Sequence, residues 1–552
     1  MPRGYAGLRQ LYRNTSIRAA AFYVAIAILI LGPLLKPGYI LTVDMVFAPH
    51  LRLPGSVSNS YLFGVILHLL NYALPSQLIE KLMLIAIFLC AGLGMNRMVR
   101  YLLPEKHLQS FSPVPLFAGL LYVINPLTYV RFMLGQYEVL LGYALLPWFI
   151  VILFTFLRTP SRNNMLRLFA VAILTSIASI HAIGFMLIFT VIASLGAVWR
   201  QYKDHIWLKA FAGRSLLLGA LFIVGSSYWL IPLFLGHSPT AVTLSNFTAS
   251  DRQAFATVPG HLGLIGNVLA LQGTWSDPQN LYLLPQDVLN YWLIPLLAVW
   301  LLVLAGIIWS WRNERAKLGF FGATIIVGTV LAVGGAGTIF APLNNWLYAH
   351  ISFFSGYRDT QKFAVLILIS YAYLASAGLY AVGKSFARYR SFGLLLPFLW
   401  TPFMIWGMSE QVYASQYPAG WYTVNALLQE NDTRGSKVLF LPWHLYMPYR
   451  FADGIIANPA PQFFSEPIVS SMNPEIGNAH GYYETMAVRT LDQRILPNAQ
   501  DNAQLAKWLT GLHISYIIVA KDYDYKSYAY LNRKPGLGVV FQDNSIILYK
   551  VE

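Results

Sequence analysis

The stretch Lys36–His50, KPGYILTVDMVFAPH, directly follows the first apolar segment of the chain and contains one carboxylate, Asp44. A carboxylate so close to an apolar segment is costly unless it is used. Pro37, Gly38 and Pro49 stand on both sides of Asp44 and predict a rigid loop. We therefore expect the rest of the chain to build a cavity over this loop, with Asp44 facing into it.

The composition defines the class of protein. Of 552 residues, 57% are hydrophobic, 15% are aromatic and only 11% are charged. Soluble globular proteins contain about 25% charged residues, so this composition indicates an integral membrane protein. The single cysteine, Cys90, lies in an apolar run and rules out an intramolecular disulfide.

Eleven apolar segments predict an α-helical polytopic membrane protein with about eleven transmembrane helices. An untilted helix needs about 20 residues to cross a bilayer, so flanking residues must extend the shorter segments. The run Met165–Trp199 is too long for one helix, and we place a break at His181–Gly184. The predicted segments are Ala19–Leu35, Leu82–Met95, Val114–Val130, Val139–Leu157, Leu168–Ile180, Phe185–Trp199, Ser215–Phe234, Leu293–Trp309, Leu318–Val333, Phe363–Val382 and Phe392–Met408.

The distribution of basic residues predicts the orientation. Six alternate segments, from the N-terminus to the one around Lys384, carry twenty Lys and Arg residues. The opposite connections carry seven: Lys36, Arg52, Lys81, Arg131, Arg252, Arg358 and Lys362. The positive-inside rule then places the N-terminus in the cytoplasm, and eleven crossings place residues 409–552 outside. We expect no cleavable signal, because Lys36-Pro37 follows the first segment where a small-residue cleavage site would stand.

The net charge of +15 does not indicate a nucleic-acid partner. A nucleic-acid surface needs its basic residues clustered on one folded face. Here they are spread between apolar segments, so we expect membrane lipids and no nucleic acid as partners. The expected location is the cell (plasma) membrane, which the chain crosses several times.

The long outside connections carry the candidate site residues. After Asp44 and His50, the apolar residues of Tyr61–Ala73 recur at helical spacing, which predicts an amphipathic helix in the membrane interface. The short connection Arg131–Glu138, RFMLGQYE, holds a cation and a carboxylate against the membrane. The connection Leu235–Tyr291 is rich in turns.

Two further cations precede an apolar helix. The stretch Tyr357–Lys362, YRDTQK, ends where the span Phe363–Val382 begins. Arg358 offers a planar fork and the helix start offers free N–H groups, so Arg358 and Lys362 are well placed to hold a phosphate.

The composition changes at about Ser409. Residues 1–408 are predicted to form the membrane domain, and 409–552 a small extracytoplasmic α/β domain. Its expected helices are Trp421–Glu430 and Asp501–Leu512, its strands Lys437–Pro442 and Ser515–Ala520, and its hairpin Val539–Gln542 with Ser545–Val551, turned by Asp543-Asn544. The Asn- and Pro-rich stretch Ile456–Gly481 is expected to be a long loop over this domain.

Together these features resemble the GT-C superfamily of polyprenyl-phosphate-sugar-dependent membrane glycosyltransferases. The stretches RDTQKF at Arg358–Phe363 and LHISYIIVAKD at Leu512–Asp522 resemble bacterial relatives of the mycobacterial arabinofuranosyltransferases. The Asp-x-Asp form of some members is absent, because Asp44 has no neighbouring carboxylate. The resemblance implies transfer of a sugar from a polyprenyl-phosphate donor to a glycan, lipid or protein acceptor on the outer face of the membrane.

The resemblance also implies roles for residues. A lone carboxylate suits inverting transfer, with Asp44 as the base that deprotonates the acceptor. Arg358 and Lys362, with Arg131, would stabilise the departing phosphate. Glu138 is the candidate for a second acid or a ligand of a divalent cation, the one cofactor left open. His50 and His181 are candidates for substrate binding.

Each candidate also has a structural alternative. Asp44 can tether its loop beside Lys36, and Glu138 can pair with Arg131. Arg358 and Lys362 can be interfacial cations whose stems lie along apolar surface. The histidines His50 and His181 can satisfy backbone groups near helix ends.

Two other classes of function remain open at this point. A transporter or flippase for lipid-linked sugars would also need an outward cavity, but it would more often show internal repeats and charged, broken helices. No convincing repeat is present. A non-catalytic envelope assembly protein would keep the fold without the base.

Overall fold

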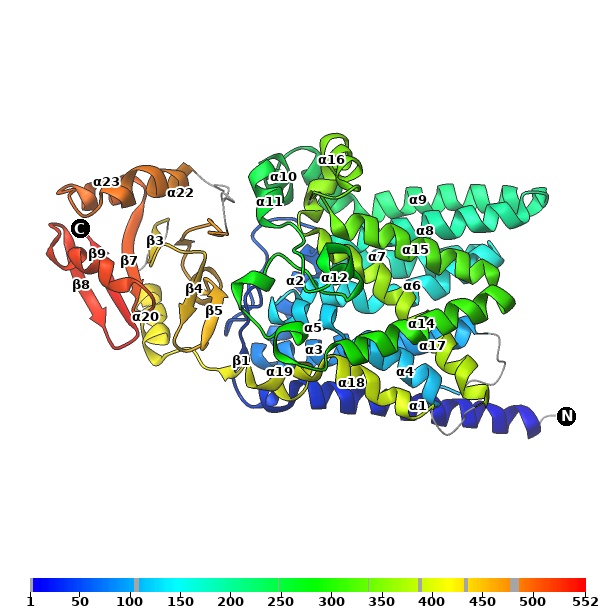
Figure 1. Ribbon diagram of the computed structural model, residues 1–552. Helices are drawn as coiled ribbons and strands as arrows, with labels where there is room; N and C mark the ends of the chain where they lie inside the picture. The colour runs from blue at the N-terminus through cyan, green and yellow to red at the C-terminus, as the bar shows by residue number, and fades with distance from the viewer. Residues whose placement is uncertain are drawn as a thin grey trace.

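The membrane-embedded part of the chain is a bundle of long apolar helices, as the computed structural model shows (Figure 1). The structure describes residues 3–103, 109–246, 248–335, 337–385, 390–430, 435–476 and 486–552. Within these ranges nine helical segments are long and apolar enough to cross a membrane. They are α1 (Arg3–Leu31) with η1 (Gly32–Leu35), α3 (Ser76–Leu102), α4 (Pro113–Val123) with α5 (Pro126–Met133), α6 (Tyr137–Arg158), α8 (Ile180–Gln201), α9 (His205–Phe234), α14 (Leu293–Asn313), α15 (Arg315–Val333), and η4 (Thr360–Phe363) with α17 (Ala364–Ser385). The predicted α-helical polytopic fold class is confirmed.

The last predicted span, Phe392–Met408, is not one continuous helix. Thr401 has φ −134° and ψ 66°, which lies outside the helical region that a following proline disfavours, and Pro402 has no N–H to continue a helix. Gly407 then adopts φ 69°. Hydropathy counts apolar residues and does not register these backbone breaks. The segment consists of η6 (Phe392–Leu395), α18 (Leu396–Trp400), η7 (Pro402–Met404) and α19 (Trp406–Glu410).

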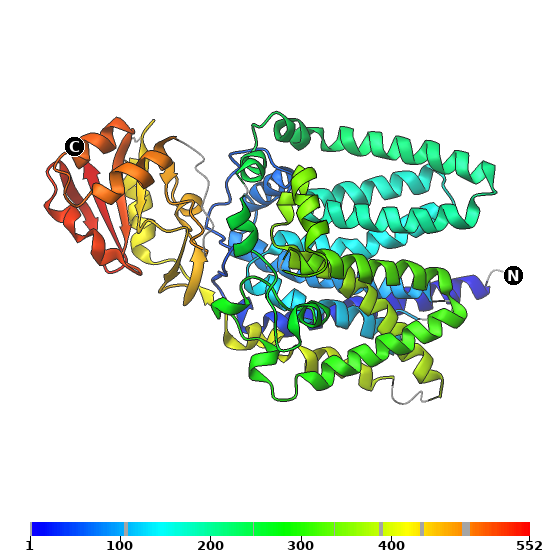
Figure 2. The same cartoon turned by 45° about the horizontal axis from the view of Figure 1, so that its top comes forward.

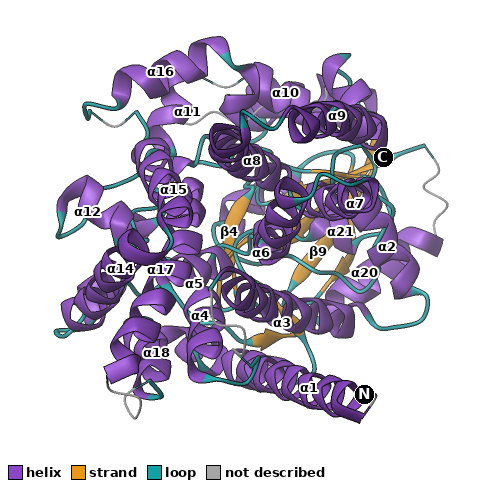
Figure 3. Cartoon of the chain, turned by 90° about the vertical axis from the view of Figure 1, so that its right-hand side faces the viewer, coloured by secondary structure: helices purple, strands orange, loops and turns teal. Residues whose placement is uncertain are grey.

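The predicted span Leu168–Ile180 corresponds to α7 (Arg162–Ala178), which has 17 residues. This length is below the about 20 residues of an untilted span. Helix α7 nevertheless packs within the bundle against α6, α8 and α9 (Figure 3). The break before α8 falls at Ser179, which is extended at φ −158° and ψ 127°. His181 therefore lies in the first turn of α8, where the sequence predicts the break.

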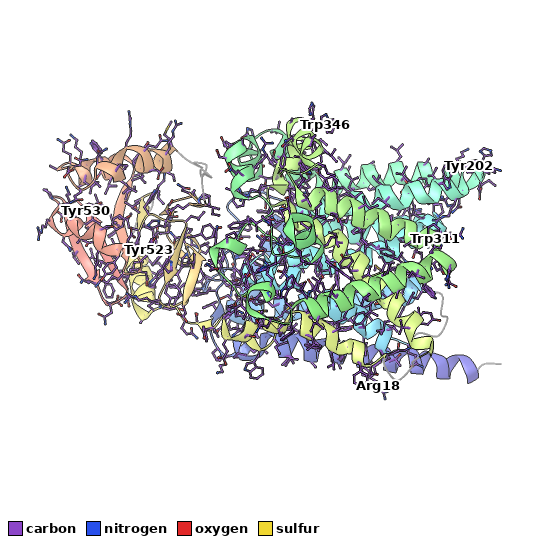
Figure 4. All side chains as sticks on the ribbon, in the orientation of Figure 1. Arg18, Tyr202, Trp311, Trp346, Tyr523 and Tyr530 are labelled. Carbon is purple, nitrogen blue, oxygen red and sulfur yellow. The ribbon has the colours of Figure 1, made fainter. Side chains whose placement is uncertain are left out.

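The basic connections lie together at one end of the bundle. The N-terminal end of α1, the α8–α9 turn and the α14–α15 turn lie at the end remote from the C-terminal sheet (Figure 1). Tyr202 and Trp311, which neighbour these turns, are found there (Figure 4). Lys106 and Arg388 fall outside the described residues. The grouping agrees with the predicted charge pattern, and the side of the membrane that each end faces stays a prediction.

Helix α17 forms the centre of the bundle and packs against α14, α15 and α4. Two glycines permit its closest contact. A Cβ atom at Gly306 of α14 would overlap the backbone of Leu374, and one at Gly378 of α17 would overlap the backbone of Leu302. Small residues that let two helix backbones approach are a common way to join helices in lipid.

Short helices cover the bundle end that faces the C-terminal sheet (Figures 1 and 2). Among them is α2 (Tyr61–Asn71), at the position of the predicted amphipathic helix. Its exposed face carries Leu62, Ile66, Leu69 and Leu70. The others are α10 (Pro239–Ser245), α11 (Ala249–Ala254), α12 (Gly263–Leu269), α13 (Pro285–Val288), α16 (Ala341–His350) and η3 (Ser352–Tyr357).

The C-terminal region contains a five-stranded sheet with the order β6-β3-β7-β9-β8. Strands β6, β3 and β7 are parallel, whereas β9 is antiparallel to β7 and β8. Asp543 accepts hydrogen bonds from the backbone of Ser545 (2.7 Å) and Ile546 (2.9 Å), which closes the predicted hairpin. The elements are α20 (Ala419–Glu430), β3 (Lys437–Leu441), β6 (Ile468–Val469), α22 (Met486–Thr490), α23 (Leu505–Gly511), β7 (Ile514–Ala520), β8 (Leu537–Gln542) and β9 (Ile546–Val551).

Part of the predicted loop Ile456–Gly481 is ordered differently from expectation. It contributes the end of β5 (Gly454–Ala457), α21 (Ala460–Phe463) and β6. Strand β6 adds an edge to the sheet because Ile468 and Val469 pair with β3. The predicted loop residues 477–481 fall outside the described residues.

The loop that follows η1 and carries Asp44, called the first loop below, joins the bundle to the C-terminal region. Strand β1 (Tyr39–Ile40) pairs with β2 (Ala414–Ser415), and the Ala457 N–H donates to the Val43 carbonyl at 2.7 Å. The Tyr417 hydroxyl donates to the Phe47 carbonyl at 2.8 Å. The loop that carries Asp44 is therefore held from both sides.

Candidate functional site

Asp44 stands at the tip of a tight turn. Thr42 and Met45 exchange backbone hydrogen bonds of 3.2 and 2.9 Å, and the Asp44 N–H donates to the Leu134 carbonyl at 3.0 Å. A side chain at Gly135 would overlap the backbone of Met45, and Gly135 has φ 71°. Position 135 of the stretch RFMLGQYE therefore requires glycine, because the turn Thr42–Met45 packs directly against its backbone.

The start of α3 fixes the other end of the loop. The Gly38 N–H donates to Gln77 Oε1 at 2.6 Å, and the Ile40 N–H donates to Glu80 Oε2 at 3.0 Å. Lys81 donates to the Lys36 carbonyl. Glu80 is completely buried. The sequence carries a signal for this role, because the acid Glu80 and the base Lys81 stand side by side at the start of an apolar helix.

The Asp44 carboxyl opens into a cavity of about 230 Å³ between the bundle and the C-terminal region. The Tyr446 hydroxyl donates to Asp44 Oδ1 at 2.7 Å. Burial by the surrounding protein raises the pKa of Asp44 above its usual value, whereas the Tyr446 hydrogen bond and the charges of Lys362 and Arg358 act in the opposite direction. Asp44 thus combines access to a cavity with raised basicity, as a general base needs.

Arg358 and Lys362 line the same cavity as Asp44. The Arg358 guanidinium lies over the Phe255 ring, 4.4 Å from its centroid. Among the described residues, Arg358 has neither a salt bridge nor a hydrogen-bond partner. Lys362 Nζ lies 3.1 Å from Nε2 of His181. The cavity wall therefore carries these two cations together with three carboxylates, Asp44, Asp359 and Glu475.

A second cavity, of about 330 Å³, shares Arg358 and Lys362 with the first. His181 lines this second cavity, and its Nε2 also lies 3.2 Å from the Gly356 carbonyl. A neutral imidazole nitrogen either accepts from Lys362 or donates to Gly356. The structure thus places His181 beside Lys362, in a second cavity that shares Arg358 and Lys362 with the Asp44 cavity.

Arg131 is buried behind the cavity and does not line it. Its guanidinium pairs with Asp359, donates to Gln361, and donates to Gln136 Oε1 at 3.0 Å. Asp359 and Gln361 are neighbours of Arg358 and Lys362 in the chain. Through these contacts Arg131 holds the stretch Tyr357–Lys362, YRDTQK, in position. A contact between Arg131 and the donor phosphate stays a prediction.

Replacing Arg131 with methionine should strongly destabilise the protein, because it leaves the buried Asp359 carboxylate without its cation. Breaking a buried pair on one side costs about 3–5 kcal/mol. Thermal unfolding of the purified protein in detergent should show a large drop in Tm, and the added change Asp359→Leu should recover much of it. Arg252→Gln serves as the control, because Arg252 is stacked on Tyr348 at the surface. Equal Tm values for Arg131→Met and the control would contradict this role.

The loop between Gly273 and Tyr282, which contributes to the wall of the Asp44 cavity, is stabilised by the buried carboxyl group of Asp277. Asp277 accepts hydrogen bonds from the Gly273 N–H (2.9 Å) and the Tyr282 hydroxyl (2.7 Å). Burial raises its pKa to about 6. The stabilised loop places Trp275 and Gln279 on the cavity wall.

His50 and Glu138 are not in the Asp44 site. Both line a separate cavity of about 570 Å³ beside α2. Tyr137 and Phe47, whose ring centroids are 5.7 Å apart, also line this separate cavity. Glu138 does not pair with Arg131, whose partner is Asp359. A role for Glu138 as a second acid at Asp44 is therefore not supported by the geometry.

Within the described part of the chain, no group of three or more His, Cys, Asp and Glu side chains is arranged to hold a metal ion.

The C-terminal region supplies cavity residues that the sequence analysis missed. Tyr446 and Glu475 both line the Asp44 cavity. Glu475 is held by His444, whose Nδ1 lies 2.9 Å from Oε1. No local sequence pattern reveals these residues, since they lie about 400 positions after Asp44.

Comparison with known proteins assigns the chain to a family. Residues 75–397 match DUF6541, a family of unknown function. The chain belongs to this family. The matched segment includes Arg131, Glu138, His181, Arg358 and Lys362, whereas Asp44 and His50 precede it. No curated protein matches the chain.

The fold is similar to that of a solved membrane glycosyltransferase. Arabinofuranosyltransferase AftD from Mycobacteria, solved by cryo-EM, matches with a TM-score of 0.63 at 14% identity, covering 97% of this chain and 40% of AftD. A mutant of AftD matches with a TM-score of 0.60 at 15% identity, covering 97% and 41%. This family member therefore has a GT-C-like fold, and it spans about 40% of the length of AftD.

Proposed function

We propose that the protein is an integral membrane glycosyltransferase that moves a sugar from a polyprenyl-phosphate donor to a glycan, lipid or protein acceptor. One observation carries the proposal: Asp44 lines one cavity with Arg358 and Lys362, two cations far from it in the sequence, at one end of a GT-C-like bundle. The structural similarity to AftD adds support, because AftD is an arabinofuranosyltransferase.

The reaction follows from the chemistry of these groups. Asp44 accepts the proton of the acceptor hydroxyl, and the acceptor oxygen forms the new bond to the anomeric carbon. The bond from that carbon to the phosphate oxygen breaks, and the phosphate leaves with the electron pair. Arg358 and Lys362 stabilise the charge that develops on it. One base and no protein nucleophile give inversion at the anomeric carbon.

A transfer assay tests the proposal. The full chain, reconstituted in liposomes with a radiolabelled sugar-phosphopolyprenol, is expected to move label to an added acceptor and to release polyprenyl phosphate. A panel of donor sugars and acceptors is needed, because the sugar is not specified by the cavity. Movement of intact donor between leaflets without release of polyprenyl phosphate would support a flippase instead.

The proposal requires the Asp44 cavity to face outward. A reporter that is active only outside the cytoplasm should be active when fused after Met408 and inactive when fused after Arg390. The basic end of the bundle would then be cytoplasmic, as the positive-inside rule predicts. Activity of the Arg390 fusion together with silence of the Met408 fusion would invert the topology and contradict an outward site.

A further inference from the structure

The cavity of about 570 Å³ beside α2 is not used by the proposed reaction. It lies between the loop that follows Asp44, the inner face of α2, the first turn of α6 and residues Pro461 and Gln462 of the C-terminal region. It is lined by His50 and Glu138, two predicted site residues that do not line the Asp44 cavity. Polar and aromatic side chains both line it.

The wall of this cavity is fixed in place. His68 Nδ1 donates to the Leu51 carbonyl at 2.6 Å. Further along, the Asn59 amide donates to the Ser176 carbonyl at 3.1 Å, and the Tyr228 hydroxyl donates to the Asn59 carbonyl at 2.5 Å. The loop is thus attached to α2 at one point and to α7 and α9 at another. The cavity is preformed, as ligand sites usually are.

The charges of this cavity differ from those of the Asp44 site. Glu138 has no salt bridge among the described residues, and Ser60 interacts with its carboxylate. Arg52 is the one permanent cation among the described residues that line the cavity, and the negative charge of Glu466 interacts with it. The interior therefore has no excess of positive charge, and an unpaired carboxylate disfavours a phosphate or another anion.

The side chains around Glu138 suit a ligand rich in hydroxyl groups. Glu138 can only accept hydrogen bonds when ionised, whereas Ser58 and Gln462 can both donate and accept. Tyr61 and Phe63 add aromatic surface on which the apolar face of a sugar ring can lie. A site built to bind hydroxyl groups discriminates strongly against ligands that lack them.

The cavity adjoins the Asp44 site through neighbouring residues. Gln136 lines the Asp44 cavity, and the next residues, Tyr137 and Glu138, line this one. On the first loop, Asp44 lines one cavity and Val46 lines the other. We propose that the cavity beside α2 binds the neutral sugar chain of the acceptor, with Glu138 accepting hydrogen bonds from its hydroxyl groups. This inference rests on the proposed function.

Direct binding tests the site without relying on transfer. The full chain in nanodiscs is titrated calorimetrically with neutral tetrasaccharides of arabinose, galactose, mannose and glucose, and separately with dodecyl phosphate. At least one tetrasaccharide is expected to bind. Glu138→Gln should weaken that binding about tenfold, the worth of one hydrogen bond to a charged group. Gln462→Trp, a change at an exposed position that obstructs the cavity, should weaken it as well.

Asp287→Asn provides the matched control, because Asp287 is an exposed carboxylate that faces His261 and lines none of these three cavities. Binding in this control should equal that of the wild type. The double variant Arg358→Gln with Lys362→Gln should also bind the tetrasaccharide normally, since those cations belong to the other site.

The results separate this inference from the proposed function. Glu138-dependent tetrasaccharide binding in a protein that transfers no sugar would support the cavity and contradict the transferase. Absence of tetrasaccharide binding, equal binding by wild type and Glu138→Gln, or displacement of the tetrasaccharide by dodecyl phosphate would each overturn the inference, and the last result would identify a lipid phosphate site.

Discussion

Replacing Asp44 with asparagine is expected to reduce sugar transfer by about 10²-fold or more, the usual worth of a general base. Asparagine keeps the size of the side chain and can still accept from Tyr446, which donates to Asp44 Oδ1 at 2.7 Å. The backbone bond from residue 44 to Leu134 is unaffected. Expression, membrane insertion and Tm should therefore remain close to wild type while transfer of label is lost.

The pH dependence gives an independent check on the same residue. Burial raises the pKa of Asp44, so the ionised fraction falls as the pH decreases through a value above the usual range. Transfer by the wild type should fall along this acidic limb. Tyr446→Phe removes a hydrogen bond that favours the ionised form, so the limb should move to higher pH with a smaller loss at the optimum.

If the Asp44→Asn variant transfers sugar at the wild-type rate, Asp44 is not the catalytic base. The next carboxylate to test would be Glu475, which lines the same cavity. Glu138 would not be the next choice, because it lies in the separate cavity beside α2.

The sequence predicted the parts of this molecule that depend on local pattern. Nine of the predicted spans correspond to long apolar helices, because burial in lipid and helical length leave a strong signal in composition. The hairpin at Asp543-Asn544 also follows from local turn chemistry. The prediction of one continuous helix failed at Phe392–Met408, where Pro402 and the conformation of Gly407 interrupt an apolar run.

The candidate site was predictable only in part. Asp44, Arg358 and Lys362 were chosen for their positions near the ends of apolar segments, and the structure brings them to one cavity. The partner of Arg131 was not predictable, because Asp359 lies 228 positions away and competes with the nearer Glu138. Tertiary packing alone also decides that Tyr446 reaches Asp44.

Replacing both Arg358 and Lys362 with glutamine is expected to raise the donor KM at least tenfold or to abolish transfer. Arg358 has no hydrogen-bond partner among the described residues and is held over Phe255, so its guanidinium is available to a phosphate. Lys362 is buried except at the cavity, and among the described residues the one hydrogen-bond partner of its Nζ is His181. Hydrogen bonds to charged groups contribute about 1.5–3 kcal/mol each.

The control for the double variant is Arg252→Gln. Arg252 is also on the membrane-domain surface, but it stacks on Tyr348 and donates to Asn345 at 3.2 Å, and it lines neither the Asp44 cavity nor its neighbour. Its donor KM should equal that of the wild type. The single variants Arg358→Lys and Arg358→Gln further separate charge from fork geometry, because lysine keeps the charge and loses the bidentate contact.

Comparing the donor KM, the acceptor KM and kcat of the double variant shows whether Arg358 and Lys362 bind the donor phosphate. Phosphate contacts formed in both the bound donor and the transition state raise the donor KM, whereas contacts that strengthen as the phosphate leaves lower kcat. The acceptor KM should not change, because the cavity beside α2 contains neither cation. An unchanged donor KM with an unchanged kcat would show that Arg358 and Lys362 do not bind the phosphate and only lie along the apolar surface at a helix start.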